Sequence, residues 1–80
     1  MIDKSTYLNL KREIKCYCRK NVIKLCDDME LTDIERTLLL DFYNNELVVH
    51  TCMKLCISEK THSKYMRILF SKIYDYKNTQ

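Results

Sequence analysis

The sequence predicts an all-α protein: a single domain over residues 1–80, folded as a small bundle of about four helices. Two observations support this fold class. The chain contains no glycine and no proline, so it lacks the residues on which most tight turns and hairpins depend. Its apolar residues, 46% of the chain, recur at helical spacing, with the charged residues, 31%, between them. Both features are typical of a globular helical domain.

The first predicted helix is long and amphipathic and covers residues 6–28, with Ser5 or Thr6 as its N-cap. Its apolar positions repeat every three or four residues, at Tyr7, Leu10, Ile14, Tyr17, Cys18, Val22, Leu25 and Met29. A thinner second stripe, Cys16 and Ile23, lies on the far side of this helix. These two residues are candidates for contact with a partner protein, or with a second copy in a homodimer. Alternatively, they are isolated surface apolar residues.

Two shorter helices are predicted next. Thr32 and Glu35 have capping-box spacing, which predicts a helix over 33–43. The side chains expected in the core from this helix are Ile34, Leu38, Leu39 and Phe42. A third helix is predicted over 47–55, after a turn at two asparagines. Its expected core residues are Val48, Cys52 and Leu55.

The last predicted helix, over 58–73, has two chemically different faces. Its core stripe consists of His62, Met66, Leu69, Phe70 and Ile73. Its opposite face carries Lys60, Lys64 and Arg67, with Ser63 beside them. Ser58 is the expected N-cap, with its hydroxyl near the N–H of Thr61, and the polar chain beyond Tyr76 is expected to be loose. Such a helix can lie against nucleic acid or be an ordinary solvated surface helix.

The cysteines, the charge and the missing motifs argue against several kinds of protein and site. Five cysteines, an odd number, do not predict a disulfide framework, and no CxxC or HxxxH pair completes a zinc site, so we expect small buried apolar side chains. The net charge of +3 permits an anionic partner without requiring one. No apolar run approaches the roughly 20 residues of a membrane span and no signal peptide is visible, which predicts a cytoplasmic protein without a membrane partner. Without paired acids, a phosphate loop or an oriented Cys–His pair, neither catalysis nor a cofactor is expected.

Two segments resemble a known family. Residues 31–43, Leu-Thr-Asp-Ile-Glu-Arg-Thr-Leu-Leu-Leu-Asp-Phe-Tyr, resemble the opening helix of the sigma-factor C-terminal (region four) helix-turn-helix domain, written L-P-x-x-E-R-x-x-L-x-L-x-Y. Residues 55–61, Leu-Cys-Ile-Ser-Glu-Lys-Thr, resemble its L-G-I-S-x-x-T turn and recognition-helix start. The two segments have the expected order and spacing, and the resemblance implies a helix-turn-helix core over 31–76.

Three positions depart from the family pattern. Cys56 replaces the turn glycine, at a position that often requires a positive φ. Thr51 replaces a usual core isoleucine, and His62 replaces a usual core valine. The turn is therefore a place where the structure can differ from the family.

The leading functional prediction is a small transcription regulator that binds duplex DNA sequence-specifically through the 58–73 helix. By position, the resemblance places this helix in the major groove. The DNA contacts that it implies are Lys60, Ser63, Lys64 and Arg67, with Ser58 and Thr61 on phosphate or capping the helix.

The alternative prediction is a protein-interaction module on the same fold, either an RNA polymerase-binding factor or a phage-encoded inhibitor of a host system. The missing turn glycine, the modest charge and the second apolar stripe favour it. The salt dependence of DNA binding separates the two functions, because only a DNA reader loses affinity steeply as salt rises.

Overall fold

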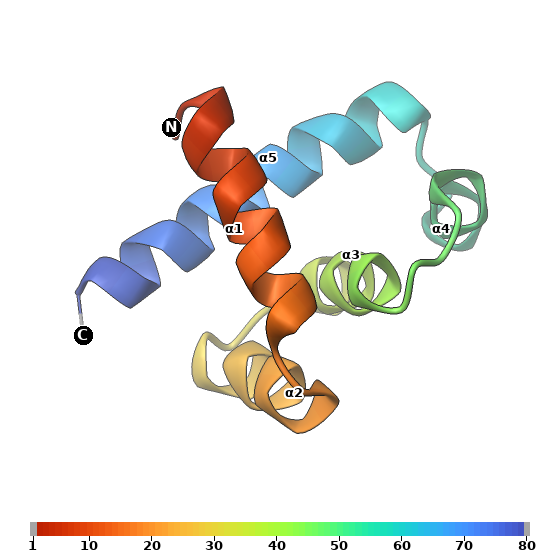
Figure 1. The fold of residues 1–80 in the computed structure, drawn as a ribbon. Coiled ribbons are helices and arrows are strands. Elements are labelled where there is room, and N and C mark those ends of the chain that lie inside the picture. Colours follow the sequence, from red (N-terminus) through yellow and green to blue (C-terminus); the bar gives the residue numbers. More distant parts are fainter. Residues whose placement is uncertain (1, 80) are drawn as a thin grey trace.

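The computed structural model describes residues 2–79, which contain five α-helices and no strand. The helices are α1 (Lys4–Cys16), α2 (Arg19–Asp28), α3 (Asp33–Tyr43), α4 (Val48–Leu55) and α5 (Glu59–Asn78). The longest helix, α5, runs across the molecule; α1 crosses its middle and α4 lies beside its N-terminal end (Figure 1). The all-α prediction is therefore confirmed, with five helices where about four were predicted. Within residues 2–79, no helix is both long enough and apolar enough to cross a membrane.

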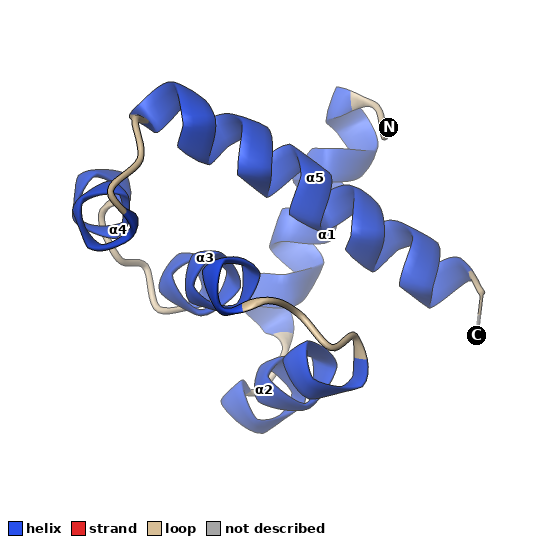
Figure 2. Cartoon of the chain, turned by 180° about the vertical axis from the view of Figure 1, so that it is seen from behind, coloured by secondary structure: helices blue, strands red, loops and turns tan. Residues whose placement is uncertain are grey.

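The prediction of one continuous helix over residues 6–28 is wrong. The segment forms α1 and α2, which run in different directions (Figure 2). Tyr17 and Cys18 between them have extended backbone. A straight helix of that length would measure about 35 Å, whereas the longest extent of the whole domain is 34 Å. A continuous helix would therefore be as long as the whole domain.

Breaking the helix brings both halves to one core. Val22 and Cys26 of α2 are fully buried, in the same cluster as Ile14 of α1. The break leaves a carbonyl outside any helix, and this carbonyl, of Tyr17, accepts a hydrogen bond of 2.6 Å from the Tyr43 hydroxyl. The packing of α2 against α3 thus stabilises two separate helices where the local apolar spacing favoured one continuous helix.

The N-cap of α1 is Asp3, instead of the predicted Ser5 or Thr6. Its Oδ1 accepts a hydrogen bond of 2.8 Å from the Thr6 N–H. This bond lowers the pKa of the Asp3 carboxyl group. A carboxylate also suits the positive end of the helix, which starts two residues earlier than the spacing predicted.

The bounds of α3 agree with the predicted helix over 33–43. Thr32 and Glu35 form the predicted capping box, with both reciprocal hydrogen bonds at 3.2 Å. The Glu35 carboxylate also pairs with Lys72 of α5 at 2.6 Å. Burial opposes its ionisation, but the hydrogen bonds from Lys72 and Thr32 outweigh burial and lower the pKa of Glu35. Ile34, predicted to lie in the core, is 44% exposed because it lies in the first turn of α3, one turn before the buried face begins.

The third predicted helix, over 47–55, is α4 and begins one residue later. Its buried residues are Thr51 and Cys52, whereas Val48, predicted to face the core, is 46% exposed. The Thr51 hydroxyl donates a hydrogen bond of 2.8 Å to Oδ2 of Asp41 on α3. A buried threonine is therefore accommodated by a specific acceptor.

The connections after α2, α3 and α4 share one geometry. Each contains one residue with positive φ: Glu30 (53°), Asn45 (61°) and Cys56 (56°). Each also has a backbone hydrogen bond that spans five residues, from Leu31 to Cys26, from Glu46 to Asp41 and from Ile57 to Cys52. This is the Schellman pattern, in which a left-handed residue closes a helix C-terminus. Because the chain contains no glycine, three residues with side chains adopt this left-handed backbone conformation. Each costs about 1 kcal/mol relative to the right-handed conformation.

The core is built by α1, α2, α3 and α5, together with Leu31 of the α2–α3 connection. Its members are Leu10, Ile14, Val22, Cys26, Leu31, Leu38, Leu39, Met66, Leu69, Phe70 and Ile73. At its centre, Phe70 packs edge-to-face against Tyr7 at 5.4 Å and against Phe42 at 5.6 Å. No residue of α4 belongs to this buried cluster.

The C-terminal segment is helical as far as Asn78, so the prediction of a loose chain beyond Tyr76 is wrong for the described residues. Lys77 anchors this end to α1: its ammonium group forms an ion pair with Glu13 and donates a hydrogen bond of 3.1 Å to the Tyr17 hydroxyl. The last turn of α5 is thus held by a contact with residues far away in sequence.

The cysteines only partly agree with the expectation of buried apolar side chains. Two of them are buried and three are exposed, and all five are free thiols. The buried ones are Cys26 and Cys52, and the exposed ones are Cys16, Cys18 and Cys56. The exposed three lie at helix ends, where the core does not reach.

Candidate nucleic-acid interface

The inner face of α5 is anchored in the core. Met66, Leu69, Phe70 and Ile73 are at most 4% exposed. The predicted core stripe of this helix is therefore confirmed, with His62 half-buried at its N-terminal end. Because consecutive turns of the helix are anchored, the outer face of α5 is presented on a rigid support.

The outer face of α5 presents three cations to solvent. Lys60, Lys64 and Arg67 are all exposed, and none of them forms an ion pair with a carboxylate of residues 2–79. Ser63, next to them on the helix, is exposed as well. Three other lysines are tied to acids, among them Lys54 to Asp41 at 2.7 Å. Exposed cations on α1 and α2 also form no ion pair within residues 2–79, namely Lys4, Arg12, Arg19, Lys20 and Lys24. Lys60, Lys64 and Arg67 thus have their full charge available to an external anion.

Ser58 and Thr61 are engaged in starting the helix. Ser58 Oγ accepts a hydrogen bond of 3.1 Å from the Thr61 N–H and donates one of 3.0 Å to the Thr61 hydroxyl. The predicted N-cap is therefore confirmed. With both hydroxyls committed to the cap, Lys60, Ser63, Lys64 and Arg67 remain as the predicted contact residues without such a role.

The chain's own first helix does not cover this face. In Figure 1, α1 crosses α5 near its middle, and the N-terminal half of α5 continues past it toward α4. Of the three cations, Arg67 lies nearest to α1, with its guanidinium carbon 6.0 Å from the centre of the Tyr7 ring. The crevice beside it also contains Asp3 and Lys4. Arg67 therefore lies where α1 meets α5, whereas Lys60 and Lys64 lie on the turns before it.

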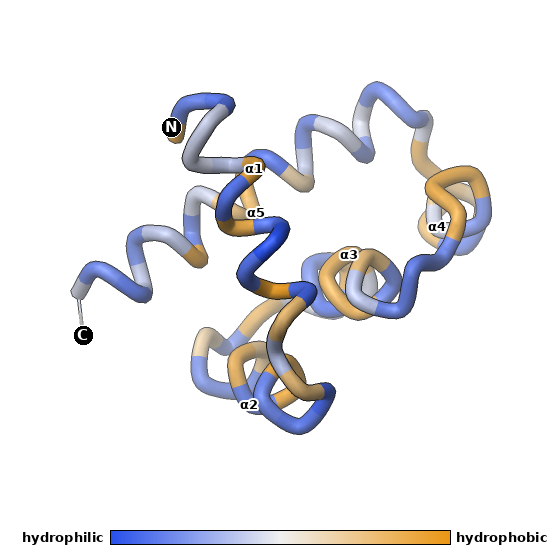
Figure 3. Tube along the Cα trace, viewed as in Figure 1, coloured by the Kyte–Doolittle hydropathy of each residue, from blue (hydrophilic) through white to orange (hydrophobic). Residues whose placement is uncertain are grey.

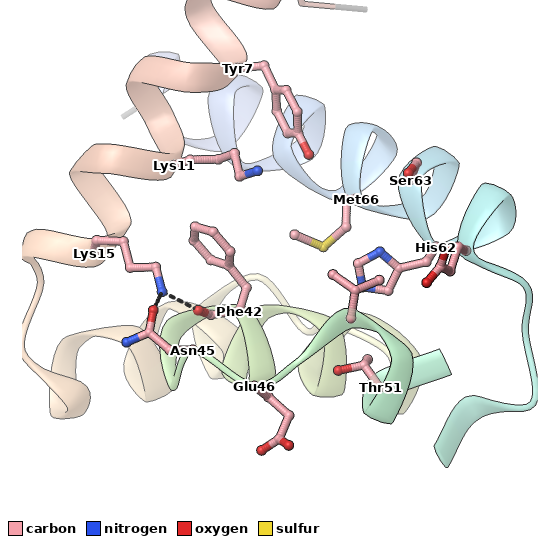
Figure 4. A pocket seen from close by; sticks show the side chains of 12 residues that line it. Tyr7, Lys11, Lys15, Phe42, Asn45, Glu46, Thr51, His62, Ser63 and Met66 are labelled. Carbon is pink, nitrogen blue, oxygen red and sulfur yellow. Dashed lines mark hydrogen bonds between the residues drawn. The ribbon is translucent and has the colours of Figure 1, made fainter. Parts of the chain in front are cut away.

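A groove of about 610 Å³ opens between α1, the α3–α4 connection, α4 and α5 (Figure 4). Lys15 closes one end: its ammonium group donates hydrogen bonds to the Phe42 carbonyl and to Asn45 Oδ1, and so caps the C-terminus of α3. Desolvation, helped by the nearby charge of Lys11, lowers the pKa of Lys15. Lys11 lies 5.0 Å from the centre of the Tyr7 ring and 5.3 Å from that of Phe42.

The groove is of mixed charge. Glu46 and Glu59 line it together with the two lysines of α1. Partial burial lowers the pKa of His62; Glu59 opposes this effect and Lys11 adds to it. Because two carboxylates offset the two lysines and the lowered pKa of His62 disfavours its cationic form, the groove is not an anion-binding site. Lys60, Lys64 and Arg67 lie outside the groove, on the outer face of α5.

The sequence reasoning missed the roles of Lys11 and Lys15. The two residues lie four apart along the edge of the apolar stripe of the first predicted helix. That position predicts side chains that extend along neighbouring apolar surface. Which aromatic rings receive them depends on where α3 and α5 pack.

The predicted partner residues, Cys16 and Ile23, are both exposed but lie on different helices. Cys16 ends α1 and Ile23 lies in the middle of α2, where it is 38% exposed. The expected stripe along one helix therefore does not exist, because the turn at residues 17 and 18 separates its two members.

With this geometry established, comparison with known proteins gives no independent guide to function. No protein-family model, no curated protein and no solved structure matches the chain.

Proposed function

We propose that this protein binds duplex DNA as a small transcription regulator, with α3, α4 and α5 as a helix-turn-helix core and α5 as the recognition helix. The connection between α4 and α5 is three residues long, at 56–58. Its first residue, Cys56, has left-handed backbone at the place where the resembled motif has glycine. This supports a turn of the same shape in spite of the different side chain.

The observation that carries the proposal is the exposed and unpaired state of Lys60, Lys64 and Arg67 on a helix whose other face is buried. In the major groove, lysine and arginine hydrogen-bond guanine N7 and O6, and on the flanks they pair with phosphates. Ser63 lies at the edge of this face, where it also lines the groove, and can donate or accept a hydrogen bond. The protein then acts by binding alone, through positioning on the duplex, without a chemical step.

The test measures binding of the full chain to a labelled random-sequence duplex by fluorescence anisotropy, at about 50 and about 200 mM salt. We expect Lys64→Ala and Arg67→Ala each to weaken binding roughly fivefold or more at low salt, because each removes an interaction worth about 1 kcal/mol or more. Removal of a cation that binds phosphate also reduces the salt slope by about one.

The matched control is Lys20→Ala, which removes an exposed cation from α2 without touching α5. This variant should bind like the wild-type chain, and circular dichroism should show unchanged helicity in all three variants. Unchanged affinity in both α5 variants at low salt rejects the proposal.

A second candidate function is the protein-interaction module, such as an RNA polymerase-binding factor or an inhibitor of a host system. It is favoured by one observation, the high exposure of apolar side chains on α4, where Met53 is 72% exposed. A chain of this kind shows little affinity for the duplex at either salt concentration.

A further inference from the structure

Lys4 is an exposed cation at a place where it does not stabilise its own helix. It is the first residue of α1 and forms no ion pair with a carboxylate of residues 2–79. The N-terminal end of a helix carries partial positive charge, which favours acids there and disfavours a lysine. The first turns of α3 and α5 contain such acids, whereas that of α1 contains none. A residue that departs from a local rule in this way is typical of a functional surface.

Lys4 adjoins the cations of α5. A small crevice between α1 and α5 is lined by both Lys4 and Arg67. Arg67 lies against α1, with its guanidinium carbon 6.0 Å from the centre of the Tyr7 ring. Asp3 is the single acid among the residues that line the crevice, and its Oδ1 already accepts a hydrogen bond from the N–H of Thr6. The exposed positive charge of α5 therefore continues onto the first turn of α1.

The start of α1 and the N-terminal half of α5 lie along the same edge of the molecule (Figure 1). In Figure 3 the first turns of both helices are blue to white, which marks them as hydrophilic. From this edge α1 runs past the middle of α5 toward α2 and α3. An α-helix with its side chains is about as wide as the major groove of DNA. If α5 lies in that groove, an element beside it at the same edge meets the sugar-phosphate backbone.

We propose that Lys4 contacts a phosphate of the DNA strand beside α5, so that the first turn of α1 is a second part of the DNA-binding surface. This inference rests on the proposed function and extends it from one helix to two. A lysine ammonium group is a compact charge with three donors on a flexible stem, which suits a phosphate. Such a contact carries no sequence information but fixes the orientation of the protein on the duplex. Lys4 thus adds affinity for any duplex, whereas α5 distinguishes sequences.

The test measures binding of Lys4→Ala, in the full chain, to two labelled duplexes, one rich in A·T pairs and one rich in G·C pairs. Fluorescence anisotropy at about 50 and about 200 mM salt gives the affinity and its salt slope. We expect roughly threefold weaker binding at low salt, by the same factor for both duplexes, and a salt slope lower by about one. Lys4→Arg keeps the charge and should bind like the wild-type chain. Because alanine is a good helix former, circular dichroism should show unchanged helicity in Lys4→Ala.

Arg12→Ala is the matched control. Arg12 is an exposed cation of the same helix and is also unpaired within residues 2–79. It lies about 12 Å further along the helix axis than Lys4, in the part of α1 that has passed α5 (Figure 1). At that distance its charge is largely screened from the duplex. Arg12→Ala should therefore bind like the wild-type chain.

The outcomes separate this inference from the proposed function. If Lys4→Ala binds like the wild-type chain while Lys64→Ala and Arg67→Ala bind more weakly, the inference is wrong and the proposed function stands. Equal losses in Lys4→Ala and Arg12→Ala also contradict it, because they indicate attraction by net charge instead of a local contact. A loss confined to one of the two duplexes overturns the phosphate contact in favour of a base. A wild-type chain without affinity for either duplex removes both proposals together.

Discussion

Two consecutive helices, α3 and α4, are held in the domain by different means. α3 begins at a capping box and contributes two residues to the main core, Leu38 and Leu39. α4 has no side-chain cap at its N-terminus, contributes no residue to that core and ends at a left-handed cysteine. It is held through Thr51 and Lys54, which both bind the Asp41 carboxylate of α3, and through Leu55, which is partly buried and packs against the edge of the core as predicted.

The difference shows which helix depends on local signals and which on its neighbours. An isolated helix of eight residues without a cap is unstable in water, so α4 exists because α3 and α5 hold it. Its outward apolar residues therefore make little contribution to folding. Three pairs of substitutions test this difference between the two helices.

The largest contrast is expected between alanine substitutions at one buried position of α3 and one exposed position of α4. Leu39→Ala should lower the free energy of unfolding by about 2–5 kcal/mol, because it opens a cavity at a fully buried site of α3. Met53→Ala on α4 should change it by less than about 0.5 kcal/mol. Urea unfolding followed by circular dichroism measures both. Comparable destabilisation in the two variants would show that the outward residues of α4 contribute to folding as much as the core residues of α3.

A smaller effect is expected where α4 is attached. Thr51→Val keeps the shape of the side chain but removes the hydroxyl that donates to Asp41, so we expect the free energy of unfolding to fall by about 1 kcal/mol. Thr37→Val, at a half-buried position of α3, is the control and should cost less. If Thr51→Val is as stable as the wild-type chain, the packing of α4 does not depend on this hydrogen bond.

The smallest effect is a stabilisation, at the turn between α4 and α5. Cys56→Gly should raise the free energy of unfolding by about 0.5–1 kcal/mol, because glycine adopts the left-handed conformation at lower cost. Cys16→Gly makes the same change at a helical residue of α1 and should instead be destabilising. Thermal and urea unfolding of the two variants measure whether each change in the free energy of unfolding is positive or negative. Destabilisation by Cys56→Gly would mean that the cysteine side chain, and not its backbone, stabilises the turn.

Features that depend on residues close together in the sequence were predicted correctly, whereas features that depend on distant contacts were not. The bounds of α3 and the start of α5 were predicted correctly, since each depends on a cap between residues three apart. The core stripe of α5 followed from its period. For the candidate site, the same reasoning identified the cations of the outer face but not the positions of Lys11 and Lys15 over aromatic rings of the groove.

Local sequence is sufficient to specify that this protein is helical, where its α3 and α5 helices begin and which side of α5 enters the core. These properties depend on residues within one or two turns of each other. Three other features depend on tertiary packing: the break of the first predicted helix after Cys16, the left-handed backbone of three residues other than glycine, and the outward apolar side of α4. At the break, contacts of α2 with the core outweigh a local helical preference of at most about 1 kcal/mol per residue.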